Sequence, residues 1–355
     1  MDWGTKLIGY TCSYIPVELL SATGFQPYRL LHGDRNLLIE GEKLVRVDAC
    51  PLVKANLGYL MQNQKEFVAL VGSTGCDLAR RLFDVVMDLT PIPVYLIHNP
   101  RTDNPEIFNE EIDWLCGQLE NLSGKRFTQN LLVEEIEKWE GYRQSLRTVS
   151  QMLSLPPTAR AITPHPTFTS LDQKLSAQFF HQLCINYHKG KMITGDEGKN
   201  DDQDKKIPGS NTGKPRVYLL GSPIPYEANL ILQLLERDLS IVGDFNCGLS
   251  RFLNIEIKEK NLDGIKSAYY HQPPCPFKRP NQHFYEWISE ELKRLNCSGI
   301  VVWTLDYCDH YEFELSRMER KFGLPVLRIR SDLSFQNIAQ TKLRIGSFAE
   351  MLGAE

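Results

Sequence analysis

Residues Gly299–Pro325 read GIVVWTLDYCDHYEFELSRMERKFGLP: an apolar run, one cysteine and a charged run, in that order. The apolar run is short, which predicts a strand, and the charged run has the spacing of a helix. Cys308 therefore lies where a predicted strand ends and a predicted helix begins. Backbone N–H groups at a helix start favour negative charge, so this position favours a thiolate.

A second stretch, Glu66–Met87, reads EFVALVGSTGCDLARRLFDVVM and has the same order of features, with Cys76 at the junction. The residues after Cys76 have the apolar spacing of a helix. Alternating strands and helices indicate a mainly parallel sheet with helices on its faces. We therefore predict an α/β fold with two Rossmann-like, doubly wound parallel-sheet lobes and a helical segment between them.

The 355 residues divide into four predicted parts. Strand–helix alternation marks an N-terminal lobe over residues 1–104 and a C-terminal lobe over residues 215–355. Residues 105–189 show long helical periodicities, which predicts a helical layer or lid between the lobes. Residues 190–214 are polar and rich in Gly, Asp and Lys, which predicts a mobile loop or linker.

Apolar patterning and turn residues predict the individual elements. Lys6–Tyr10 is a short apolar lead before Cys12. The expected strands are Pro27–Leu31, Asn36–Glu40, Lys43–Val47, Glu66–Gly72, Pro93–Ile97, Arg216–Gly221, Leu239–Val242, Ser298–Leu305 and Pro325–Ile329. The expected helices are Pro16–Leu20, Leu52–Gln62, the run after Cys76, Glu106–Leu122, Gln129–Leu153, Ser170–His188, Tyr226–Glu236, Asn281–Leu295, His310–Phe322 and Phe335–Leu352.

Composition argues against several classes of function. The net charge of −4 lacks the excess of positive charge that is typical of nucleic-acid-binding proteins, so we expect no nucleic-acid partner. No apolar run reaches the roughly 18–20 residues of a membrane span, so we expect no membrane association. The start, MDWGTKLIGYTCSY, lacks the pattern of a signal peptide, and we expect a cytoplasmic protein. Neither GxxxxGK[ST] nor GxGxxG occurs, so we do not expect ATP or NAD binding through those motifs.

The chain has nine cysteines, an odd number, with no CxxC pair. This argues against a disulfide framework, a zinc knuckle and a thioredoxin-type site. In open α/β sheets, ligands bind beyond the carboxyl ends of the strands. The cysteines that follow apolar strand-like runs are Cys12, Cys50, Cys76, Cys247 and Cys308. Three of them, Cys50, Cys76 and Cys308, also precede predicted helices, and they are either ligands of a metal site or free core thiols.

The other cysteines have simpler interpretations. Cys116 and Cys184 lie inside amphipathic helices, where a small apolar thiol is common. Cys297 precedes its strand and is expected to pack in the core. Cys275 lies in the Pro-rich loop HQPPCPFKRP and is a candidate rim residue.

Five motifs together resemble the family of 2-hydroxyacyl-CoA dehydratases and benzoyl-CoA reductases, in particular the smaller dehydratase subunit. They are IGYTCSYIPVELLSATGFQPYRL (Ile8–Leu30), CPLVKANLGYL (Cys50–Leu60), GCDLARRLFD (Gly75–Asp84), VGDFNCGLSRF (Val242–Phe252) and LDYCDHYEFELSRMERKFGLPVLRIRSD (Leu305–Asp332). The resemblance covers nearly the whole chain except Gly190–Lys214.

The resemblance implies a [4Fe–4S] cluster between two α/β lobes, held by three cysteines that map onto Cys50, Cys76 and Cys308. Three thiolates leave one iron of the cube open, and an open iron distinguishes a catalytic cluster from an electron carrier. The implied activity is that of a lyase, a 2-hydroxyacyl-CoA dehydratase, or of a related low-potential reductase. Cys12 is not counted as a ligand, whereas Cys247 is either a fourth ligand or a neighbouring hydrogen-bonding group.

The resemblance also implies partners: an ATP-hydrolysing iron–sulfur activator, a second subunit that is identical or homologous, and an acyl-CoA-type substrate. In the dehydratases, one electron enters the thioester carbonyl as a ketyl radical and water is then lost. A related branch carries a double-cubane [8Fe–9S] cluster in a homodimer and reduces small molecules. A non-catalytic electron-relay subunit is a further alternative.

Two other residues are candidates for function. Glu18 matches an acidic position of the family and is the candidate catalytic residue, moving a proton near the cluster; alternatively it interacts with the helix dipole. Arg251 either pairs with a CoA phosphate or forms a surface ion pair.

Overall fold

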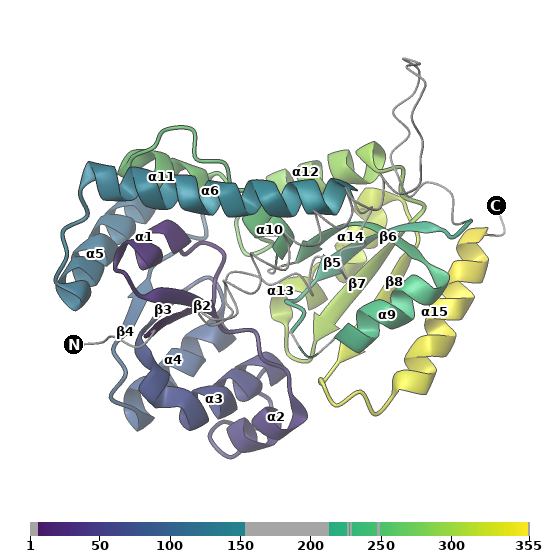
Figure 1. Ribbon diagram of the computed structural model, residues 1–355. Coiled ribbons are helices and arrows are strands. Elements are labelled where there is room, and N and C mark those ends of the chain that lie inside the picture. The colour runs from purple at the N-terminus through teal and green to yellow at the C-terminus, as the bar shows by residue number, and fades with distance from the viewer. Residues whose placement is uncertain (1–5, 153–212, 226, 228, 247–248, 354–355) are drawn as a thin grey trace, which may run out of the picture.

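The computed structural model describes residues 6–152, 213–225, 227, 229–246 and 249–353 of the chain. The predicted helix Ser170–His188, almost all of the predicted loop 190–214, and Cys184 and Cys247 lie outside this range. Figure 1 shows the two sheets side by side, each with helices packed against it.

The first sheet has four strands in the order β2-β1-β3-β4, and every neighbouring pair is parallel. Its strands are β1 (Leu7–Tyr10), β2 (Gln26–Arg29), β3 (Phe67–Ser73) and β4 (Val94–Ile97). The central strands β1 and β3 carry apolar side chains on both faces. Ile8 and Val71 contribute to the core under α1 (Val17–Ala22) and α5 (Pro105–Ser123). Leu7 and Leu70 contribute to the core under α3 (Pro51–Asn63) and α4 (Asp77–Leu89).

The second sheet repeats this plan, with parallel strands in the order β6-β5-β7-β8. Its strands are β5 (Arg216–Gly221), β6 (Ser240–Asn246), β7 (Gly299–Leu305) and β8 (Val326–Ser331). Every residue of β7 is buried, as expected for a strand covered on both faces. Val301 and Trp303 pack with α9 (Asn229–Asp238) and α15 (Ile338–Gly353). Ile300 and Val302 pack with α12 (Gln282–Arg294) and α14 (Leu315–Phe322). The predicted α/β class with two parallel-sheet lobes is confirmed.

The described helices of the first half are α1 (Val17–Ala22), α2 (Arg35–Glu42), α3 (Pro51–Asn63), α4 (Asp77–Leu89), α5 (Pro105–Ser123) and α6 (Gln129–Met152), with a 3₁₀ turn at Gln64–Glu66. Those of the second half are α9 (Asn229–Asp238), α10 (Leu249–Leu253), α11 (Leu262–Tyr270), α12 (Gln282–Arg294), α13 (Asp309–Glu312), α14 (Leu315–Phe322) and α15 (Ile338–Gly353). No helix in these described parts is both long and apolar enough to cross a membrane.

The predicted strands Asn36–Glu40 and Lys43–Val47 are wrong. The first is helix α2, because the Asp34 side chain caps it by accepting hydrogen bonds from Asn36 N at 2.8 Å and Leu37 N at 3.4 Å. The second is irregular and precedes α3.

Glycines explain how α2 packs tightly on α3. A Cβ built on Gly41 would lie 1.8 Å from Lys54 O, and one built on Gly58 would lie 2.0 Å from Leu37 O. Such close backbone contact is a tertiary feature that a short apolar alternation does not reveal.

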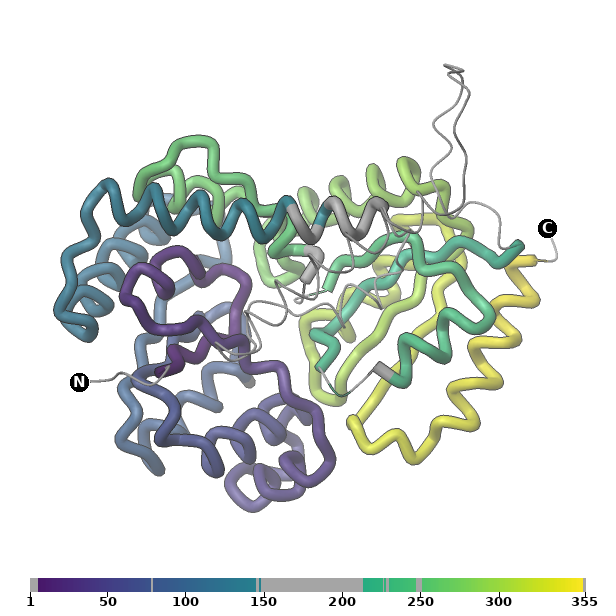
Figure 2. Tube along the Cα trace, viewed as in Figure 1, coloured from purple at the N-terminus to yellow at the C-terminus, as the bar shows by residue number. Residues whose placement is uncertain are grey.

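The predicted helix His310–Phe322 is divided into α13 and α14, with Glu314 as the N-cap of α14. Helix α11 was not predicted, and its position is the main departure from a simple two-lobe arrangement. It comes from the C-terminal half of the chain, yet Figure 2 shows it beside α5. Ile265 and Tyr269 of α11 share a core cluster with Ile8 and Phe108 of the first lobe. The predicted domain boundaries stay a prediction.

Candidate functional site

Each of the three predicted ligand cysteines directly precedes a helix. Cys50 is the N-cap residue of α3, Cys76 of α4 and Cys308 of α13. Neither Cys76 nor Cys308 makes a side-chain hydrogen bond that caps its helix. The N–H dipoles of all three helix starts favour negative charge near the thiols.

The strands place two of these cysteines as expected. Cys76 follows β3 after the turn Thr74–Gly75, and Cys308 follows β7 after Asp306 and Tyr307. Cys50 differs, because the run before it is not a strand. It still lies toward the carboxyl edge of the first sheet, because α3 leads back to the amino end of β3.

Cys50 and Cys76 lie close enough for their charges to interact. Burial, with the negative charge of Cys76 as the second cause, raises the pKa of the Cys50 thiol to about 12. Backbone N–H groups of Leu52 and Val53 act against this by hydrogen bonding to the sulfur. Without a nearby cation the Cys50 thiol stays protonated. Because a bound metal displaces the proton of a thiol ligand, Cys50 and Cys76 are suited to bind a positively charged metal group.

Cys308 lies in the second lobe, at the start of α13. It is half-buried and packs against the core cluster that contains Cys50, and also against the cluster under α12 and α14. Within the described ranges, no three His, Cys, Asp or Glu side chains are already arranged to hold a metal ion. The donor chemistry of the three thiols fits an iron–sulfur cluster, and their role as ligands stays a prediction.

The remaining described cysteines lie elsewhere. Cys116 packs against the first-lobe core, where burial raises its pKa to about 12, and Cys297 packs against the second-lobe core, where burial raises its pKa to about 11. Cys12 and Cys275 are half-buried beside the core cluster of α5 and α11.

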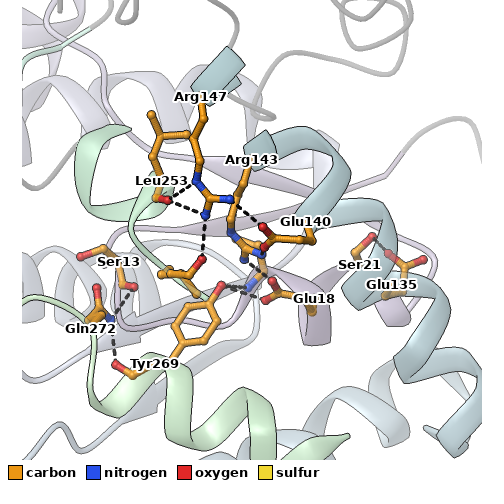
Figure 3. Close-up of polar contacts among 12 residues, drawn as sticks. Ser13, Glu18, Ser21, Glu135, Glu140, Arg143, Arg147, Leu253, Tyr269 and Gln272 are labelled. Carbon is orange, nitrogen blue, oxygen red and sulfur yellow. Dashed lines mark hydrogen bonds and ion pairs between the residues drawn. The ribbon is translucent and has the colours of Figure 1, made fainter. Parts of the chain in front are cut away.

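Glu18, the predicted catalytic residue, is fully buried and held by two partners (Figure 3). Arg143 of α6, also fully buried, donates a hydrogen bond to Glu18 Oε1. The hydroxyl of Tyr269 donates to Glu18 Oε2 at 2.8 Å and accepts from Val17 N at 3.1 Å. These contacts join α1 to α6 and α11, and the role of Glu18 in proton transfer stays a prediction.

Arg251 is 1% exposed, so the surface ion pair that was one interpretation of it is wrong. Its Nη2 donates to Gln272 Oε1 and to Pro273 O, each at 3.1 Å, and its guanidinium lies 4.9 Å from the centre of the Tyr14 ring. The side chain therefore stabilises the loop that follows α11.

Sequence reasoning missed the neighbours of Cys275 in that loop. Lys278 Nζ donates to Asn99 Oδ1 at 2.7 Å and to Pro100 O at 2.8 Å. Burial lowers the pKa of Lys278 to about 8. The Pro-rich run HQPPCPFKRP was the available signal, because clustered prolines indicate a fixed loop path, but its contacts are with residues more than 170 positions away.

Known proteins match nearly the whole chain. The family described as 2-hydroxyglutaryl-CoA dehydratase, D-component, matches residues 12–352. A protein of Escherichia coli strain K12 described as a dehydratase subunit, YjiM, is 21% identical over 98% of this chain and 92% of its own length.

Two further relatives belong to named enzymes. The (R)-phenyllactyl-CoA dehydratase beta subunit of Clostridium sporogenes is 23% identical over 98% of this chain and 92% of its own length. A benzoyl-CoA reductase subunit of Thauera aromatica is 20% identical over 87% of this chain and 80% of its own length. These matches support an enzyme-associated role. The chain belongs to the 2-hydroxyglutaryl-CoA dehydratase D-component family.

Proposed function

We propose that the chain is the iron–sulfur subunit of a radical 2-hydroxyacyl-CoA dehydratase, a lyase, or of a related low-potential reductase. In this proposal Cys50, Cys76 and Cys308 hold a [4Fe–4S] cluster with one iron open. The observation that carries it is the placement of all three cysteines at helix starts, with two thiols close enough for their charges to interact. Family membership supports the class of enzyme.

The chain's own residues provide the environment for such a group. Backbone N–H groups of Leu52 and Val53 stabilise the Cys50 thiolate once its proton is lost. Cys50 is 9% exposed and belongs to a core cluster of apolar side chains, so water has little access to its thiol. When bound, the cluster would supply one low-potential electron to the thioester carbonyl of the substrate.

Partners are part of the same proposal. The relatives are named as subunits, which supports a second subunit that is identical or homologous to this chain. We further propose that an ATP-hydrolysing iron–sulfur activator supplies the electron and that a 2-hydroxyacyl-CoA is the substrate. Because a reducing compartment preserves free thiols, we propose a cytoplasmic location.

The test is loss of water from 2-hydroxyacyl-CoA thioesters under anaerobic conditions. The assay contains the chain with its second subunit, the activator, ATP and a low-potential reductant. We expect turnover that requires both ATP and activator and that Cys308→Ser abolishes. Turnover that persists in Cys308→Ser would contradict the proposal. A sulfide-bridged pair of cubes in the purified protein would instead identify the double-cubane reductase.

A further inference from the structure

The loop Cys275–Asn281, CPFKRPN, connects α11 to α12 and contacts both of the turns that carry Cys76 and Cys308. Neighbouring residues of the loop contact the first lobe, which carries Cys76, and the second lobe, which carries Cys308. The loop therefore links two parts of the chain directly, although Cys76 and Cys308 are 232 positions apart in the sequence.

On the first-lobe side, Lys278 reaches the turn before Cys76 through one intermediate residue. Lys278 Nζ donates to Asn99 Oδ1 at 2.7 Å, and Asn99 N donates to Thr74 Oγ1 at 3.1 Å. Asn99 is 1% exposed, so this link is shielded from water. Arg279 N also donates to Arg101 O at 2.6 Å, which fixes the loop backbone beside the chain that follows β4.

On the second-lobe side, the loop is bound to Glu314, which follows α13 and is 5% exposed. Its carboxylate accepts from Arg279 Nη2 at 3.2 Å, Asn281 Nδ2 at 2.7 Å and the Tyr285 hydroxyl at 2.5 Å. Glu314 N donates to Tyr311 O at 3.1 Å, within the short segment that begins at Cys308. Charge-assisted hydrogen bonds of this kind are stronger than neutral ones, so the position of this segment depends on the loop.

Phe277 lies between the two turns. Its ring meets the His310 ring edge to face, with the centroids 5.8 Å apart and an interplanar angle of 78°. A Cβ built on Gly75 would lie 3.7 Å from Phe277 Cδ1, so the same ring is in contact distance of the residue before Cys76. The side chain therefore lies close to a residue on each of the two cysteine-bearing segments.

We propose that Phe277, Lys278 and Arg279 are positioning residues that hold the turns of Cys76 and Cys308 at a fixed separation. The identity of the ligand that both thiols would share rests on the proposed function. The separation itself is a property of the chain without that ligand, so it can be measured independently.

The experiment uses the full chain, iron-free and reduced, with a flexible bismaleimide as the probe. Peptide mass spectrometry quantifies the cross-link between Cys76 and Cys308 among all cross-linked pairs. The yield depends on how often the two thiols come within reach of one reagent. We expect it to fall several-fold in Phe277→Ala and in Lys278→Met, because each removes one of the contacts that fix the turns.

Two variants serve as matched controls. Phe313→Ala removes a phenyl ring that is 83% exposed, and Lys260→Met removes an exposed ion pair with Glu137. Both are expected to give the wild-type yield. Circular dichroism establishes that each variant is folded, and Lys278→Met, which keeps the loop's apolar packing, tests the inference if Phe277→Ala does not fold.

A second readout separates this inference from the proposed function. After reconstitution with iron and sulfide, a chelator is expected to remove iron faster from Lys278→Met than from wild type and Lys260→Met. If wild type binds no iron but the loop variants still lower the cross-link yield, the function fails and the positioning role stands. If folded loop variants cross-link like wild type, or if wild type gives no Cys76–Cys308 cross-link, the positioning role is overturned.

Discussion

Arg143 of α6 forms an ion pair with Glu18 of α1, and neither side chain is exposed to solvent. The two residues are 125 positions apart, and Tyr269, which shares the carboxylate, is 251 positions from Glu18. The contact therefore joins three helices that belong to distant parts of the chain.

We predict that Glu18→Ala lowers the free energy of unfolding by about 3–5 kcal/mol, because it leaves the Arg143 charge buried without its carboxylate. Urea denaturation of the iron-free chain measures the change. Replacing both partners, as Glu18→Met with Arg143→Met, should recover much of the loss, since a well-packed apolar pair costs little. If Glu18→Ala is as stable as wild type, the pair does not stabilise the fold.

Glu18→Gln examines the other role predicted for this residue. A proton-transfer role requires that the reconstituted enzyme lose turnover while the variant stays folded. A structural role requires that stability fall and that turnover per folded molecule be retained. Measuring kcat together with the denaturation midpoint separates the two, and Ser21→Ala, beside Glu135 on the same pair of helices, is a control for local disturbance.

Lys278 should make stability depend on pH. Burial disfavours the charged form of Lys278 and is the main reason why its pKa falls from 10.5 to about 8. The positive charge of Arg251 lowers the pKa as well, whereas the negative charges of Cys275, Cys12 and Asp103 act in the opposite direction. Between these two pH values the unfolded chain binds more protons than the folded one, so the free energy of unfolding rises with pH. The difference in stability between wild type and Lys278→Met should therefore increase in favour of wild type from pH 8 to 10.5. Denaturation of both proteins across that range measures it, and a difference that stays constant would contradict the assigned shift.

Gly58 provides a test of how α3, which begins after Cys50, packs on α2. We predict that Gly58→Ala destabilises the chain by about 1–3 kcal/mol, because the new Cβ would lie 2.0 Å from Leu37 O and the helices must separate. Gly117 of α5 is the matched control, since a Cβ there meets nothing within 4 Å and alanine should stabilise the helix by about 0.5–1 kcal/mol. Thermal unfolding of both variants distinguishes the two effects, and equal shifts would show that the contact is not tight.

Local sequence features predicted much of the fold. The apolar runs of β3 and β7 and the helices after Cys76 and Cys50 are all confirmed, because strand and helix periodicity is a local property. The prediction of a strand at Asn36–Glu40 is wrong, because the Asp34 cap and the close packing of α2 on α3 favour a helix there.

The candidate site was only partly predictable. The position of the cysteines before helices follows from short motifs, and each is confirmed as an N-cap residue. The contacts of Glu18 and of Lys278 were not predictable, because both depend on α11 and its loop packing against the first lobe. Such long-range pairs leave no periodic signal in a single sequence.

The most direct test of the account is the iron and acid-labile sulfide content of the chain after anaerobic purification. We predict about four irons per chain in wild type, as for one [4Fe–4S] cube. Cys50→Ser, Cys76→Ser and Cys308→Ser should each lose most of the iron, whereas Cys116→Ser, in the first-lobe core, should keep it. Wild-type iron content in folded Cys308→Ser would contradict the proposed ligand set.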